Sequence, residues 1–185
     1  MERAVQRQLY SYLSSNHLLS PTQHGFRPRH STETALTHVS DSILSATDSG
    51  QISILCLIDL SKCFDVISHS KLLEQLELLG VDPNWFKNYL FGTTQSVSLT
   101  GSDGRLQIST SLAIRQGIFQ GSALGPVLFC AFANDLSLYV ADAQVVQYAD
   151  DTQVLVSGPK SAVPELISRM EASLLLLATT STQTV

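Results

Sequence analysis

The chain has 185 residues, of which 44% are hydrophobic and only 15% charged, so its composition excludes a disordered chain and predicts one globular domain. A formal net charge of −5 argues against the basic surface typical of nucleic-acid-binding proteins. The three cysteines form no Cys-x-x-Cys pair, which argues against zinc, and the sequence shows neither a signal peptide nor a membrane-length apolar run. We therefore expect an intracellular protein, nuclear or cytoplasmic, with no membrane partner.

The first fifty residues predict two helices joined by a loop. Residues 2–19 follow an amphipathic helical pattern, and residues 20–31 contain the prolines and glycine typical of a loop. Helical spacing resumes over 31–46, and Gly50 closes that segment. The expected apolar stripes are Val5, Leu9, Tyr12 and Leu13 in the first helix, and Leu36, Val39, Ile43 and Leu44 in the second.

The rest of the chain mixes strands and helices. The run "ISILCLIDL" (52–60) is rich in β-branched residues, which predicts a central strand buried on both faces. The later elements are expected to be helices over 69–80 and 82–92, two strands within 94–114 around a turn at 101–104, a buried helix over 122–136, a strand–turn–strand over 143–158, a helix over 161–178 and a polar tail over 179–185. This order predicts an α+β fold in which helices cover one side of an antiparallel sheet.

Three aspartates stand out from these elements. Asp59 ends the first predicted strand, while Asp150 and Asp151 lie at the turn of a later hairpin. If the two strands are neighbours, three carboxylates meet at one edge, which is costly unless cations are bound. Mg²⁺ prefers such oxygen ligands, and two ions about 3.5–4 Å apart catalyse phosphoryl transfer. The alternative is structural, because aspartates are common in tight turns.

Four motifs in these regions resemble the reverse transcriptases of non-LTR (LINE-type) retrotransposons. Tyr148-Ala149-Asp150-Asp151 resembles the Y/F-x-D-D motif of that family, and "LIDLSKCFDVISHSKLL" (57–73) resembles the motif with its first catalytic aspartate. "GIFQGSALGPVLFCAFANDL" (117–136) is similar to the Gln-Gly-Ser-x-Leu-Gly-Pro motif, and "QHGFRPRHSTETAL" (23–36) to the fingers motif. The resemblance covers roughly residues 2 to 178.

The resemblance implies a role for each matching residue. Asp59, Asp150 and Asp151 become the catalytic metal ligands, with Mg²⁺ as the cofactor and Mn²⁺ as a substitute; a main-chain carbonyl of Ile58 or Leu60 contributes to coordination. Phe64 becomes the aromatic wall that excludes a nucleotide 2′-hydroxyl, although it also fits a plain core position.

Further residues are assigned to substrate binding by the same resemblance. Gln120 and Gly121 shape the floor under the incoming nucleotide, and Tyr148 belongs to the same set. Arg27, and less directly Arg29, hold triphosphate oxygens, since arginine makes bidentate contacts with phosphate. The alternative for Arg27 is a solvated loop arginine. Asp65 is expected to be structural and to cap the helix that follows it, and His30 and His69 are also expected to be structural.

The implied fold is a right-hand polymerase palm over 51–178, with partial fingers over 1–50, no thumb and a polar tail over 179–185. The implied activity is RNA-directed DNA synthesis, in which a DNA primer on an RNA template attacks a dNTP. Phe119 departs from the family pattern, which has proline there, and no basic thumb follows the last helix. We therefore expect the isolated chain to extend primers poorly or not at all.

Two other functions stay open on the sequence alone. The first is a truncated retroelement relic without polymerase activity, which acts at most as a weak binding or interaction module. The second is a metal-binding protein without nucleic-acid chemistry, which requires the order of the four motifs to be chance.

Overall fold

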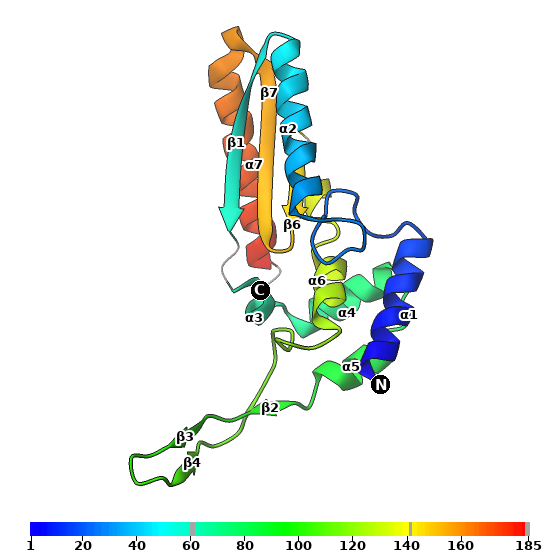
Figure 1. Ribbon diagram of the computed structural model, residues 1–185, viewed down its shortest axis with the longest axis vertical. Coiled ribbons are helices and arrows are strands. Elements are labelled where there is room, and N and C mark those ends of the chain that lie inside the picture. Colours follow the sequence, from blue (N-terminus) through cyan, green and yellow to red (C-terminus); the bar gives the residue numbers. More distant parts are fainter. Residues whose placement is uncertain (60–61, 141, 184–185) are drawn as a thin grey trace.

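The computed structural model describes residues 1–59, 62–140 and 142–183, with side chains described as far as Thr179. Figure 1 shows an elongated molecule with a sheet at one end, a group of helices at the other and a thin β-ribbon projecting from the helical end. Below, these parts are called the sheet lobe, the helical lobe and the ribbon. No helix in the described ranges is long and apolar enough to cross a membrane.

The sheet lobe is built on three antiparallel strands in the order β1-β7-β6. These strands are β1 (Gln51–Asp59), β6 (Gln144–Tyr148) and β7 (Asp151–Pro159). The prediction that the first strand is central and buried on both faces is wrong, because β1 lies at the edge and Leu57 is 70% exposed. The apolar run misleads because only its alternate residues, such as Ile54 and Cys56, pack into the core of this lobe.

Helices cover both faces of this sheet rather than one. Helix α7 (Val163–Gln183) packs on the face that carries Val145, and α2 (Thr32–Asp48) packs on the face that carries Val146. Adjacent residues of a strand point to opposite faces, so the two valines assign the helices to opposite sides. The α+β class with an antiparallel sheet is confirmed, whereas the one-sided arrangement is wrong. Helix α7 also continues through most of the segment expected to be a tail.

The buried side of α2 differs from the predicted stripe. The helix begins with a capping box between Ser31 and Thr34, as its sequence favours. Its buried residues are Ala35, Val39 and Ala46, while Leu36 and Leu44 are 64% and 60% exposed. Two of the three buried residues are alanines, which a stripe chosen from the largest apolar side chains leaves out. The face that packs on the sheet is therefore turned by about one residue from the predicted stripe.

The helical lobe surrounds a second apolar core. Its helices are α1 (Glu2–Ser15), α3 (Cys63–Val66), α4 (His69–Leu78), α5 (Asn84–Leu90) and α6 (Gly125–Phe132). Leu9 and Leu13 of α1 are buried in one core with residues of α4 and α6, as the predicted stripe requires. Tyr12 of that stripe is 40% exposed, and the helix ends at Ser15 rather than at residue 19, so these two parts of the prediction are wrong. Helix α6 is shorter than expected and is followed by the 3₁₀ helix η1 (Leu136–Tyr139); a second one, η2 (Lys160–Ala162), precedes α7.

The ribbon consists of two short ladders between α5 and α6. Strand β2 (Thr94–Gln95) pairs with β5 (Leu112–Ala113), and β3 (Ser98–Thr100) pairs with β4 (Leu106–Ile108). The predicted pair of strands around a turn at 101–104 is therefore confirmed. Every residue of these four strands is exposed, and the ribbon stands away from both lobes (Figure 1).

Candidate active site

The β6–β7 hairpin brings its two aspartates to one end of the sheet. Tyr148 pairs with Asp151, so Ala149 and Asp150 form a two-residue turn. Asp59, the last residue of β1, is the cross-strand partner of Asp151. Opposed residues on neighbouring antiparallel strands have Cβ atoms about 5 Å apart, and like charges in such positions repel. The sequence predicted that the three carboxylates meet at one edge if β1 and the hairpin are neighbours, and the two are neighbours in the sheet.

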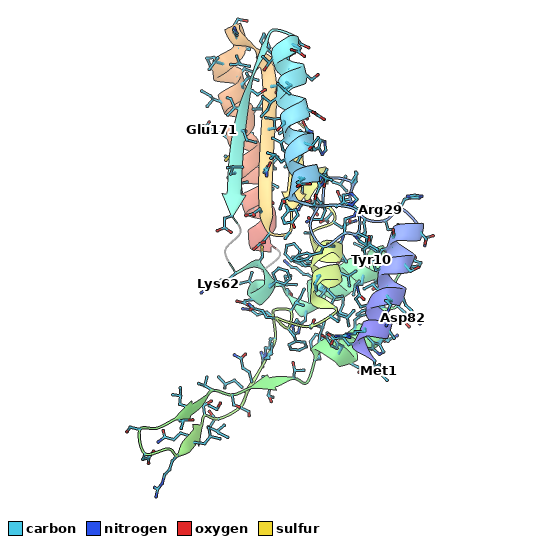
Figure 2. All side chains as sticks on the ribbon, viewed as in Figure 1. Met1, Tyr10, Arg29, Lys62, Asp82 and Glu171 are labelled. Carbon is cyan, nitrogen blue, oxygen red and sulfur yellow. The ribbon has the colours of Figure 1, made fainter. Side chains whose placement is uncertain are left out.

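The field of this cluster reaches Cys63 in the short helix α3. The pKa of the Cys63 thiol is raised to about 11, first by burial and then by the negative charges of Asp150 and Asp59. Asp59 pairs with Asp151, and Asp150 lies in the turn directly before it, so both residues lie at the end of the sheet that is nearest to α3 (Figure 1). Lys62, which begins α3 in a left-handed backbone conformation, lies below the end of β1 (Figure 2).

The donor set suits a hard divalent cation. Carboxylate oxygens are the ligands that Mg²⁺ prefers, and the cross-strand pair Asp59 and Asp151 supplies two from opposed positions. Within the described ranges, no three histidine, cysteine, aspartate or glutamate side chains are grouped closely enough to hold a metal ion. Asp59, Asp150 and Asp151 therefore lie at one end of the sheet without forming a closed set of metal ligands in this structure. Leu60, whose carbonyl is a predicted ligand, lies outside the described residues.

Phe64 lies in a cluster of three aromatic rings close to the aspartates. Its ring stacks on Phe129 at 4.6 Å between centroids and meets Phe26 edge-on at 5.9 Å. Phe129 is buried, whereas Phe64 is half-buried and retains an accessible surface. Phe64 is thus a rigid wall between core and solvent, and its part in excluding a 2′-hydroxyl stays a prediction.

Gln120 and Asp65 form a pair that the sequence did not predict. The Gln120 amide nitrogen, Nε2, donates to Asp65 Oδ1 at 2.9 Å. Helix α4, which follows Asp65, has Ser68 at its N-cap and no side-chain cap, so the predicted capping role of Asp65 is wrong. Gly121 has φ +81° and open space where a side chain would lie, so this loop leaves room beside its backbone.

The predicted triphosphate residue is engaged with its own loop. The Arg27 guanidinium donates to the main-chain carbonyls of Ser20 and Gln23, the latter at 3.1 Å. These bonds tie the partly buried Arg27 side chain to its own loop. Arg29 is exposed in the loop between α1 and α2 (Figure 2). A phosphate-binding role for either arginine stays a prediction.

Two further residues occupy supporting positions. Tyr148 is half-buried and packs against Ala35 and Val39 of α2. His69 is buried and its Nε2 is 2.8 Å from the carbonyl oxygen of Gly117, which suits the structural role expected for it. Sequence reasoning gave no role to Gln23, which contacts the hairpin turn; a glutamine in a loop carries no periodic signal that could have indicated this contact.

The order of the four motifs along this fold is that of a reverse-transcriptase domain. A family profile described as "Reverse transcriptase (RNA-dependent DNA polymerase)" matches residues 1–178, so the chain belongs to this family. It is 30% identical over 166 residues to a probable RNA-directed DNA polymerase from transposon BS of Drosophila melanogaster, covering 85% of this chain and 18% of that protein.

Other retroelement proteins are similar to the same region. A Pol polyprotein from type-1 retrotransposable element R2 of Popillia japonica is 28% identical over 136 residues, with 74% of this chain and 19% of that protein covered. The RNA-directed DNA polymerase from mobile element jockey of Drosophila melanogaster is 29% identical over 167 residues, with 85% and 18% covered. The resemblance to non-LTR retrotransposon enzymes is confirmed, and the chain spans about one fifth of the length of these relatives.

Solved structures with a similar fold include telomerases. Telomerase from Candida albicans in complex with the TWJ fragment of telomeric RNA matches with a TM-score of 0.64 at 16% identity, over 91% of this chain and 32% of that one. Apo telomerase from Candida tropicalis matches with a TM-score of 0.57 at 12% identity, over 94% and 34%. Identities this low show likeness of fold alone.

Proposed function

We propose that this chain carries the catalytic core of an RNA-directed DNA polymerase, which adds a deoxynucleotide to a DNA primer on an RNA template. The observation that carries the proposal is the cross-strand pair of Asp59 and Asp151 beside Asp150, in a chain of the reverse-transcriptase family. Such a cluster suits a reaction in which divalent cations bind phosphate oxygens.

Each residue of the site has a part in this reaction. Asp59, Asp150 and Asp151 would hold two Mg²⁺ ions, which supply charge stabilisation for the attacking and leaving oxygens when bound. Phe64, braced by Phe129, would exclude a ribose 2′-hydroxyl. Gln120, held by Asp65, would present the loop of Gly121 to the nucleotide.

Residues 51–178 would form the palm, and residues 1–50 part of the fingers. The aspartates and both strands that carry them fall within 51–178, which supports the first assignment. The loop between α1 and α2, which carries Arg27, runs beside β6 through a parallel bridge between Gln23 and Gln147. The loop that would supply this phosphate ligand therefore touches the hairpin that carries Asp150 and Asp151.

The test is primer extension on an RNA template, with Mg²⁺ and with Mn²⁺, by this chain completed with the thumb of a retrotransposon relative, because the isolated chain is expected to extend primers poorly or not at all. The activity must depend on the metal, prefer dNTPs over rNTPs and disappear in Asp59→Asn. A completed chain that is folded by circular dichroism and binds dNTP but extends no primer contradicts the proposal and supports the alternative of a non-catalytic binding module.

A further inference from the structure

The turn between β6 and β7 has a backbone that its own sequence does not favour. Ala149, its first residue, has φ +54°, in the left-handed region that glycine and asparagine favour in two-residue hairpin turns. A non-glycine residue keeps this conformation only where the surrounding structure holds it. The contacts that hold Ala149 therefore determine where the next residue, Asp150, is placed.

A single buried side chain bonds both main-chain polar groups of Ala149. Gln23 is 2% exposed. Its Oε1 accepts from the Ala149 N–H at 3.0 Å, and its Nε2 donates to the Ala149 carbonyl oxygen at 3.2 Å. Because the two bonds lie on either side of the Ala149 Cα, they fix both backbone dihedrals of that residue.

The orientation of the Gln23 amide is set by a third bond. Its Oε1 also accepts from the Gly25 N–H at 2.7 Å. A flipped amide would direct its NH₂ group at two N–H donors, so only one orientation satisfies all three partners. The carboxamide is thus a specific clamp on the turn rather than a generic filler of the space.

The loop that carries Gln23 is itself attached to β6. The Gln147 N–H donates to the Thr22 carbonyl at 2.8 Å, and the His24 N–H donates to the Gln147 carbonyl at 2.7 Å. Gly25 lies so close to the turn that an added Cβ would be 2.1 Å from the Ala149 nitrogen. The clamp therefore has a fixed base on the strand that leads into the turn.

We propose that Gln23 is a positioning residue of the active site, whose carboxamide holds the Ala149 backbone so that Asp150 faces the end of β1. Its consequence for catalysis rests on the proposed function, whereas the clamp itself is a property of the folded chain. Gln23 reaches neither substrate nor metal and acts only through the turn.

The test uses the ¹⁵N-labelled chain of 185 residues and measures amide hydrogen exchange by NMR. Gln23→Met keeps the side-chain length without the amide, and we expect the Ala149 amide to exchange about tenfold faster, the equivalent of one net hydrogen bond. The Val154 amide, in the middle of β7, should not change. Gln23→Glu keeps an acceptor for the Ala149 N–H but sets a second oxygen against the Ala149 carbonyl, so it should protect Ala149 less well than the wild type.

Thr22→Val is the matched control. Its hydroxyl contacts the Gln147 side chain at 3.3 Å, in the same loop, but does not touch Ala149. This variant should leave the exchange of Ala149 unchanged. Equal acceleration in Thr22→Val and Gln23→Met would show general loosening of the loop and overturn the proposal.

A second readout uses Mn²⁺ alone. Loss of an outer positioning contact weakens metal binding about tenfold in known sites, and we expect a weakening of that size in Gln23→Met. Unchanged Mn²⁺ affinity in a variant whose Ala149 amide has lost protection would overturn the positioning role. Neither readout needs polymerase activity, so inactivity of the wild-type chain completed with a thumb would refute the proposed function and leave the test of the Gln23 clamp unaffected.

The wild-type chain alone also tests the proposal if the variants fail to fold. The Gln23 side-chain amide protons should show nuclear Overhauser contacts with Ala149. The Ala149 amide should exchange more slowly than that of Ser102, an exposed residue in the ribbon turn. Exchange as fast as that of Ser102 would overturn the inference.

Discussion

The β6–β7 hairpin and the β3–β4 hairpin both turn through an aspartate, and the two turns are stabilised in different ways. In the ribbon, Asp103 Oδ1 accepts from the Arg105 N–H at 3.1 Å, and Gly104 supplies the positive φ of +75°. The residues that stabilise the ribbon turn are therefore neighbours in the sequence. In the β6–β7 turn, Ala149 takes the positive φ, and its backbone is bonded by Gln23, 126 positions away.

The difference shows which of two explanations applies to each aspartate. An aspartate that bonds its own turn, as Asp103 does, has the structural role common in tight turns. The β6–β7 turn instead depends on a tertiary contact, and its carboxylates stand opposite another carboxylate at the end of the sheet. A turn held from outside, against its own local preference, is typical of a functional site.

The largest effect should come from removing one carboxylate at each turn. In the chain completed with a thumb, we expect Asp150→Asn to lower the primer-extension rate about 1000-fold, because a group that stabilises transition-state charge is lost. Its thermal midpoint should not fall, since repulsion among the aspartates decreases. Asp103→Asn is the control and should leave extension unchanged. Equal losses in both variants would mean that the two turns do not differ in function.

Replacing a glycine beside each turn with alanine should lower the free energy of unfolding more at the β6–β7 turn than at the β3–β4 turn. Gly25→Ala places a Cβ 2.1 Å from the Ala149 nitrogen, so the loop must move, at a cost of about 3 kcal/mol. Gly104→Ala has open space and pays only for its positive φ, about 1 kcal/mol. Urea unfolding measures both. A smaller loss for Gly25→Ala than for Gly104→Ala would show that the loop does not support the β6–β7 turn.

Truncating one strand residue in each hairpin should give a smaller contrast. Val154 in β7 is fully buried between β1 and β6, and Val154→Ala should lower the free energy of unfolding by about 2 kcal/mol. Ile108 in β4 is 63% exposed, so Ile108→Ala should change it by less than about 0.5 kcal/mol. The measurement is again urea unfolding. Similar losses at the two positions would mean that the ribbon is covered in solution.

Local patterns predicted the features that depend on neighbouring residues. The helix over the first residues, the turn at 101–104 and the β6–β7 hairpin follow from periodicity and turn residues, and the structure contains all three. The convergence of Asp59 with the hairpin was predicted only on the condition that β1 and β7 pair. A pattern identifies a strand, but the identity of its neighbour is a property of the whole chain.

Long-range packing produced the features that the sequence did not predict. The edge position of β1 depends on which strand lies in the middle, and its apolar run fits either place. The buried face of α2 depends on how closely Ala35 and Ala46 approach the sheet. The partners of Asp65 and Gln23 lie 55 and 126 positions away, so neither bond has a local signature.

The smallest effect we predict is a dependence of stability on pH, which arises from His24 in the loop that supports the β6–β7 turn. The pKa of His24 is lowered from its usual 6.5, first by burial and then by the positive charges of His30, His38 and Arg27. The folded state therefore binds fewer protons than the unfolded state near that pH, and stability should fall as the pH drops through about 6.5.

His24→Asn should flatten the dependence of unfolding free energy on pH between about 7.5 and 5.5, because the group whose pKa differs between the two states is gone. His17→Asn is the control, since His17 is exposed at the end of α1 and should leave the slope as in the wild type. The ribbon, residues 94–113, contains no histidine, so its exchange protection should not vary over the same range. If His24→Asn keeps the wild-type dependence of unfolding free energy on pH, the pH-sensitive group is not His24. The two hairpins would then not differ in pH sensitivity.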